Sequence, residues 1–170
     1  MSVQKILLVS GAIFLLHLSV FSQTSFRKLP DIDLKSLGGE AVKSTSLLNQ
    51  EGLTVINFWA TWCKPCMLEL NAIQELYGAW QKETKVKIVA VTIDDSRNTS
   101  KVGPLVNGKG WKYQIILDSN GDFKRALNVN NIPHTFVVNS KGDILWQHNS
   151  YAPGDEDELY EIIKKNSPKL

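Results

Sequence analysis

The feature that most constrains the fold is a succession of buried strand, helix and buried strand in the middle of the chain. "LTVINFWA", residues 53–60, is β-branched, aromatic and nearly all apolar, which is typical of a strand buried on both faces. One apolar stripe then recurs at intervals of four and three residues, as it does on a helix: Cys66, Leu70, Ile73, Tyr77 and Trp80. "VKIVAVTIDD", residues 86–95, has the composition of a second buried strand. The pattern predicts a βαβ unit with a right-handed crossover.

The flanking segments predict further strands and helices around this unit. Residues 31–48 indicate two short strands around Gly38 and Gly39. Residues 96–110 predict a helix that is interrupted near Pro104, because proline lacks a backbone N–H. The other predicted elements are a strand at 113–118, a short helix at 123–127, a hairpin of "PHTFVVN" and "ILWQHN" around "SKGD", and a C-terminal helix over "DEDELYEIIKKN".

Composition limits the classes of function. The 170 residues suit one domain, and 43% hydrophobic residues with five tryptophans are typical of a globular protein. A net charge of +2, with lysines scattered along the chain, gives no support for binding nucleic acid or an acidic membrane surface. The indications of function therefore have to come from local motifs.

The N-terminus resembles a secretory signal peptide. A short segment with one lysine precedes an apolar run at 6–16, and small residues precede a cleavage point before Gln23. The run ends at His17, short of the 18 or so residues that indicate a membrane span. We expect a signal peptide at 1–22 and a mature domain at 23–170 that has no stable membrane span and is periplasmic or secreted. An uncleaved membrane anchor is the alternative.

Cys63 and Cys66 are the only cysteines, and three interpretations compete for them. A structural disulfide would close a very short loop and so would add little stability. A zinc site would have only half of its ligands here, and no metal or other cofactor is expected. A redox pair fits best, because the two cysteines lie where a buried strand turns into a helix, and an exported protein meets oxidising conditions.

Two motifs resemble the thioredoxin superfamily, specifically the exported TlpA/ResA-type thiol-disulfide oxidoreductases. They are "FWATWCKPC", residues 58–66, and "NNIPHTFVVNSKGDIL", residues 130–145, and the resemblance covers most of the chain from residue 29 onward. It implies an α/β fold: a thioredoxin-like mixed central sheet flanked by helices, with an N-terminal β-hairpin and a central insertion at 94–118. It also implies that Pro133 is cis and lies against the cysteine pair.

The two cysteines are expected to have different roles. Cys63 stands at the start of the helix, where free N–H groups and the helix dipole favour a thiolate, so it is the expected nucleophile. Cys66 lies one turn further on the apolar stripe and is expected to resolve the mixed disulfide by attacking Cys63. Pro65 suits the first turn, where its missing N–H costs little.

A base near Cys66 would assist its deprotonation. Asn57 occupies the position of the aspartate that classical thioredoxins have on the preceding strand, and asparagine cannot titrate. Glu69 follows Cys66 by three residues, and a glutamate at this position is typical of TlpA/ResA-type proteins. A solvated helix glutamate is the alternative. The family often has proline two residues beyond this glutamate, where this chain has Asn71.

Other residues near the motifs are assigned to docking or to packing. Trp62, Pro65, Ile132 and Pro133 are expected to form the substrate-binding surface, since the resemblance implies that the backbone of Ile132 pairs with an incoming chain. Trp59 is expected in the core, His134 is interpreted as structural, and His148 receives no role. Capping and solvation are expected to explain several acidic residues: Asp94, Asp95, Asp155, Glu156, Asp157 and Glu158.

Three functions compete. The first is an exported enzyme that reduces or exchanges partner disulfides through a cycle of Cys63 and Cys66 and is recharged by an upstream redox partner. The second is an oxidant that donates its disulfide, and the third is a thioredoxin-like domain that only binds. Pro65, and Ile132 before Pro133, resemble reducing thioredoxins and favour the first. The expected partners are exported proteins that carry disulfides or dithiols, with no nucleic acid among them.

Overall fold

The computed structural model describes residues 27–168, and the predicted signal peptide at 1–22 lies outside them. The strands are β1 (Asp33–Ser36), β2 (Ala41–Lys43), β3 (Thr54–Trp59), β4 (Lys87–Thr92), β5 (Gln114–Leu117), β6 (His134–Val138) and β7 (Ile144–Asn149). The helices are α1 (Lys64–Thr84), α2 (Thr99–Lys109), α3 (Asp122–Ala126) and α4 (Asp155–Asn166), with a short 3-10 helix η1 (Ser44–Leu47). The C-terminal helix and both predicted hairpins are confirmed.

All the strands join one mixed sheet in the order β2-β1-β5-β4-β3-β6-β7. β3, β4 and β5 run parallel, and the N-terminal hairpin and β6–β7 add antiparallel strands at the two sides. The predicted βαβ unit is β3–α1–β4, and it occupies the centre of the sheet. The structure thus confirms the expected mixed central sheet with an added hairpin.

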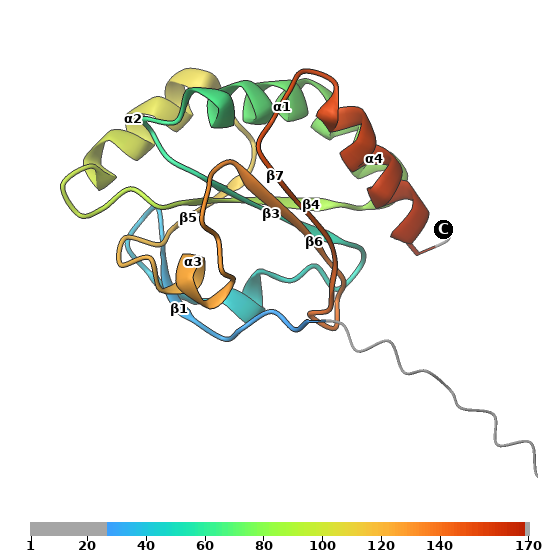
Figure 1. Ribbon diagram of the computed structural model, residues 1–170, viewed down its shortest axis with the longest axis horizontal. Helices are drawn as coiled ribbons and strands as arrows, with labels where there is room; N and C mark the ends of the chain where they lie inside the picture. The colour runs from blue at the N-terminus through green and yellow to red at the C-terminus, as the bar shows by residue number, and fades with distance from the viewer. Residues whose placement is uncertain (1–26, 169–170) are drawn as a thin grey trace, which may run out of the picture.

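Helices cover both faces of this sheet. Figure 1 shows α1, α2 and α4 on one face and α3 on the other. Alternate strand residues point to opposite faces, so Val55 packs with the α1 side chains while its neighbour Ile56 packs with Phe123 of α3. Two hydrophobic cores therefore share the sheet. Both cysteines belong to the core beneath α1 and α4.

One predicted element differs from the structure. α2 runs from Thr99 to Lys109 without interruption and contains Pro104. The residue before a proline avoids helical backbone because its Cβ and N–H meet the proline ring. Here that residue is Gly103, which has no Cβ, so the helix continues with the loss of one hydrogen bond. The predicted interruption near Pro104 is wrong for this reason.

No helix within residues 27–168 combines the length and the apolar character that a membrane crossing requires.

Candidate active site

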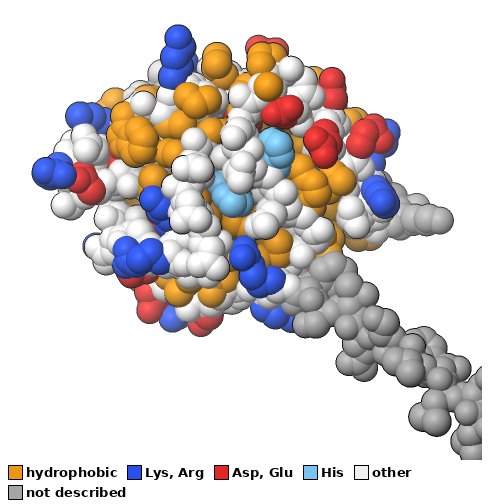
Figure 2. Space-filling view, viewed as in Figure 1, with side chains coloured by type: hydrophobic (Ala, Val, Ile, Leu, Met, Phe, Trp, Pro, Cys, Tyr) orange, Lys and Arg blue, Asp and Glu red, His pale blue; other side chains and the backbone are white. Residues whose placement is uncertain are grey.

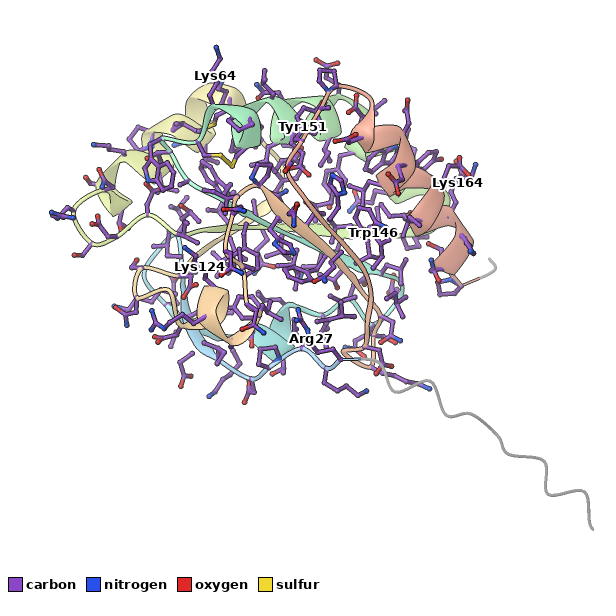
Figure 3. All side chains as sticks on the ribbon, viewed as in Figure 1. Arg27, Lys64, Lys124, Trp146, Tyr151 and Lys164 are labelled. Atoms are coloured by element: carbon purple, nitrogen blue, oxygen red, sulfur yellow. A yellow bond between two sulfur atoms is a disulfide. The ribbon has the colours of Figure 1, made fainter. Side chains whose placement is uncertain are left out.

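The two cysteines lie at the turn between β3 and α1 and form a disulfide. Cys63 is the N-cap residue of α1, and its Sγ accepts a hydrogen bond from the Cys66 backbone N–H at 3.3 Å. The first N–H groups of a helix lack intrahelical partners and carry partial positive charge. The backbone of α1 therefore surrounds the Cys63 sulfur with groups that favour negative charge there. Figure 3 shows the disulfide at the upper end of the molecule, with Lys64 pointing outward.

The surroundings of the two sulfurs differ. Cys66 is completely buried, and Cys63 lies just below the surface. Trp62 is 65% exposed and stands next to Cys63 along the chain, and Lys64 and Pro65 are also exposed. Pro65 lies in the first turn of α1, as predicted. A partner can therefore approach the pair from the side of Cys63 and Trp62.

Glu69, which follows Cys66 by three residues in α1, is buried rather than solvated, with 5% of its surface exposed. Its two carboxylate oxygens accept hydrogen bonds from Asn57 Nδ2 and from the Thr135 hydroxyl, each at 2.8 Å. Asn57 Nδ2 also donates to Thr135 Oγ1 at 2.8 Å, so the three side chains form a closed ring of hydrogen bonds. The ring joins α1 to β3 and β6, and it fixes the orientation of the carboxyl group.

Burial has the largest effect on the pKa of the Glu69 carboxyl group. It disfavours the charged form and raises the pKa from 4.5 to about 7, although the hydrogen bonds from Thr135 and Asn57 oppose this rise. Charges further away have smaller effects: His148 lowers the pKa of Glu69, and Asp155 raises it. A carboxyl group with a pKa near neutrality can take up and release a proton under ordinary conditions.

The loop before β6 completes this end of the molecule. The Ile132–Pro133 peptide bond is cis, as the resemblance implied. Ile132 is partly buried and packs against the core cluster that contains both cysteines, while Pro133 is buried. The structure thus brings Ile132 to the same cluster as Cys63 and Cys66. The predicted docking residues Trp62 and Pro65 lie at the exposed surface beside this cluster.

Known proteins share this arrangement of sequence and fold. Residues 27–147 match the AhpC/TSA family. The chain belongs to the AhpC/TSA family. Sporulation thiol-disulfide oxidoreductase A of Bacillus subtilis is 32% identical over 65% of this chain, and the match covers 66% of that relative's own length. Thiol-disulfide oxidoreductase ResA of Bacillus cereus is 28% identical over 96% of this chain and 93% of the relative.

A solved structure supports the same conclusion. A thioredoxin-like protein from Porphyromonas gingivalis is 47% identical with a TM-score of 0.73, covering 81% of this chain and 90% of the other. The predicted thioredoxin-like fold and the resemblance to ResA-type proteins are confirmed. The two curated relatives are both named thiol-disulfide oxidoreductases.

The chain's departure from the family pattern at Asn71 has a local explanation. The Trp111 indole N–H donates to Asn71 Oδ1 at 3.0 Å, and the Tyr113 hydroxyl donates to the Leu70 carbonyl at 2.6 Å. Both donors come from the segment just before β5. Asn71 therefore gives this segment a polar anchor on α1, two residues after Glu69.

Sequence reasoning missed the position of Asp94. This residue follows β4 and is almost completely buried, whereas capping and solvation were expected there. Its carboxylate accepts hydrogen bonds from the Thr61 backbone N–H at 2.8 Å, the Thr61 hydroxyl at 2.7 Å and the Thr92 hydroxyl at 2.5 Å. Asp94 thus ties the chain immediately before Trp62 and Cys63 to the end of β4. The position of Asp94 at the carboxyl end of a parallel strand next to β3 was the available indication.

His148 also has a partner that the sequence did not reveal. Its Nε2 lies 3.6 Å from Asp155 Oδ2, and its ring stacks on Trp146 with a centroid distance of 5.7 Å. His134, in contrast, is buried on the other face of the sheet and stacks on Phe136. Within residues 27–168, no three His, Cys, Asp or Glu side chains lie close enough together to hold a metal ion.

Proposed function

We propose that this protein reduces disulfides in exported partner proteins through a cycle of Cys63 and Cys66. The observation that carries the proposal is the asymmetry of the pair: Cys63 caps α1 beside the exposed Trp62, whereas Cys66 is buried on the same helix as the buried Glu69. One sulfur is placed for attack on a partner, and the other is protected until the first has reacted. The names of the relatives support the reaction type.

The cycle follows from these positions. The Cys63 thiolate attacks one sulfur of the partner's disulfide, which forms a mixed disulfide and releases the other partner sulfur as a thiolate. Cys66 then gives its thiol proton to Glu69 and attacks Sγ of Cys63, which forms the Cys63–Cys66 disulfide and releases the second partner thiolate. A dithiol donor upstream reduces the disulfide and is itself oxidised. Glu69 is the proposed base because its carboxyl group has a pKa of about 7 and lies one turn from Cys66.

The docking surface is proposed to surround the pair. Trp62 offers an exposed aromatic face, Pro65 is exposed in the first turn of α1, and the segment of Ile132 and Pro133 borders the same core cluster. Aromatic side chains supply large contact areas at low entropic cost. An extended partner chain lying between Trp62 and Ile132 would bring its disulfide to Cys63.

Export is proposed from the N-terminal sequence, with residues 23–170 as the mature thioredoxin-like domain. Residues 1–22 have the order of a charged start, an apolar run and small residues that is typical of a signal peptide. An oxidising compartment would supply the disulfide-bearing partners that the cycle needs. The direction of electron flow depends on the reduction potential relative to those partners, and a strongly oxidising potential would favour disulfide donation instead.

Single cysteine variants test this function. With insulin as the probe disulfide and dithiothreitol as the donor, the parent is expected to accelerate insulin reduction, and Cys63→Ser is expected to have no activity above the donor alone. Reduced Cys66→Ser, mixed with insulin after the dithiothreitol has been removed, is expected to accumulate a mixed disulfide through Cys63, visible as an insulin-chain adduct by mass spectrometry. If both variants reduce insulin as fast as the parent, the pair is not the active site.

A further inference from the structure

A row of polar side chains crosses the sheet beneath α1 and α4. Asn57 of β3 is paired in register with Thr135 of β6, and Thr135 is paired with His148 of β7. Directly opposed residues on antiparallel strands project from the same face, with Cβ atoms about 5 Å apart. By strand pairing, this row runs from the centre of the sheet to its edge strand β7, and it lies in an otherwise apolar layer.

The inner end of the row is closed to solvent. Glu69 is 5% exposed, and its oxygens are occupied by Asn57 and Thr135. The Asn57 amide cannot ionise, so a proton that reaches Glu69 cannot leave through Asn57. The Thr135 hydroxyl is different, because it can accept one proton and donate another. Of the two groups that bond Glu69, only Thr135 can pass the proton on.

The outer end of the row reaches the surface. The side chains of His148 and Asp155 are 35% and 34% exposed, and Nε2 of the first lies 3.6 Å from a carboxylate oxygen of the second. Asp155 opens α4, whose first turn carries four acidic residues. Figure 2 shows acidic side chains gathered beside a histidine on this face. An imidazole ring can accept a proton at one nitrogen and release one from the other, so a histidine in contact with water can pass a proton to it.

We propose that His148, held by Asp155, is the residue through which the proton on Glu69 reaches solvent. This inference rests on the proposed function, in which Glu69 takes the proton of Cys66. His148 acts through Glu69 and does not touch the reacting sulfurs. It is therefore a positioning residue, which directs the proton between Glu69 and solvent, and not a catalytic residue.

The proton count closes along this route. Cys66 S–H gives its proton to Glu69 as the thiolate attacks Cys63. The protonated Glu69 donates to Thr135 Oγ1, while the Thr135 hydroxyl turns its own proton toward the His148 ring. The imidazolium, stabilised by the Asp155 carboxylate, releases a proton to water, which returns Glu69, Thr135 and His148 to their starting protonation states. When an upstream dithiol reduces the disulfide, the same path runs in reverse and returns a proton to the Cys66 sulfur.

Neighbouring titratable groups are less suited to this task. Tyr151 lies in the loop between β7 and α4 (Figure 3), where its hydroxyl donates to Glu156 at 2.8 Å. Burial raises the pKa of Tyr151, so the phenol keeps its proton at neutral pH. His134 is adjacent to Thr135 in β6 but points to the opposite face. His148 lies opposite Thr135 on β7, and its side chain is partly exposed, so it joins the row to water.

Chemical rescue tests the relay. His148→Ala is expected to lower the rate of insulin reduction by about tenfold, and millimolar imidazole is expected to restore most of it. Pyrazole, which has the same shape but is far less basic, is expected to restore nothing. If His148 has a purely structural role, the rate of insulin reduction will also fall in the variant. In that case imidazole and pyrazole will either both fail to restore the rate or restore it equally. If His148→Ala does not fold, His148→Gln replaces it, with a flattened pH profile of the rate between pH 6 and 9 as the expected result.

The titration of Glu69 in variants of Asp155 and His148 gives a second measurement that does not depend on enzymatic turnover. Asp155→Asn is expected to lower the pKa of the Glu69 carboxyl and His148→Gln to raise it, both followed by carbon NMR of the disulfide form. Glu161→Gln is the control, because it makes the same charge change at an exposed site of α4. Equal Glu69 titration in all of these proteins would overturn the inference.

The outcomes separate the inference from the proposed function. A parent that does not reduce insulin overturns both. An active parent with a His148→Ala variant of equal rate and equal pH profile overturns the relay alone. An active parent with a slowed variant that imidazole rescues supports both.

Discussion

The carboxyl group of Glu69 binds its proton more tightly in the folded protein than in the unfolded chain, because burial raises its pKa from 4.5 to about 7. For an acid with a raised folded-state pKa, the folded state holds more protons than the unfolded state between these two values. The contribution of Glu69 to the free energy of unfolding is therefore highest below pH 4.5 and falls until the pH passes 7. The linked change amounts to roughly 3 kcal/mol.

Glu69→Gln is expected to remove this pH dependence, since glutamine does not titrate. Urea unfolding of the disulfide form at pH 4.5 and pH 8 measures the free energy of unfolding for parent and variant. The difference between the two proteins should shift by roughly 3 kcal/mol in favour of the variant at the higher pH. Glu161→Gln, at an exposed position, should follow the parent at both pH values. A constant difference between Glu69→Gln and the parent would show that Glu69 titrates like an exposed acid.

The sequence indicated some residues of the candidate site and not others. The cysteines, Glu69 and Pro133 could be found because they lie within short motifs whose spacing fixes their surroundings. Asp94 and His148 could not be assigned, because their partners depend on contacts between separate elements. Asp94 meets Thr61 only when β3 and β4 pair, and the row that includes His148 exists only once β6 is placed between its neighbours.

At the scale of elements, local pattern predicted α1, α4, the central strands and both hairpins, since each has a regular hydrophobic period or clear turn residues. It failed at α2. There, Pro104 predicts an interruption, but the residue before it is Gly103. Gly103 removes most of the steric conflict, and the conformational cost of glycine in a helix replaces it.

Two glycine substitutions test this account of α2. Gly78→Ala in the interior of α1 meets no atom within 4 Å and is expected to raise the free energy of unfolding by about 0.5–1 kcal/mol. Gly103→Ala also has space around its Cβ, but the new atom faces the Pro104 ring, so no gain is expected. Chemical denaturation of both variants gives the comparison. A gain at Gly103 equal to that at Gly78 would refute the explanation.

At the scale of the whole molecule, the sheet carries two cores, and the buried tryptophans lie in one of them. Trp59, Trp80 and Trp111 lie in the core beneath α1 and α4, and Trp146 packs against it. The N-terminal hairpin contributes Leu34 to the opposite core, with α3. β1 joins the sheet through β5 in only two register pairs. If the domain unfolds as one unit, a destabilising substitution beneath the hairpin must also shift the unfolding transition that is followed by tryptophan fluorescence on the opposite face.

Leu34→Ala tests this coupling between the two cores. Leu34 is 4% exposed, so its truncation is expected to cost about 2–5 kcal/mol through lost burial and a cavity. Tryptophan fluorescence and far-UV circular dichroism should both shift to lower urea concentration by the same amount, because neither core is stable without the shared sheet. Leu37→Ala at the hairpin turn, where the side chain is 39% exposed, should stay within about 0.5 kcal/mol of the parent. The opposite result would be a tryptophan transition in Leu34→Ala that matches that of the parent, together with faster hydrogen exchange in β1 and β2. The hairpin would then open separately from the domain that holds the cysteine pair.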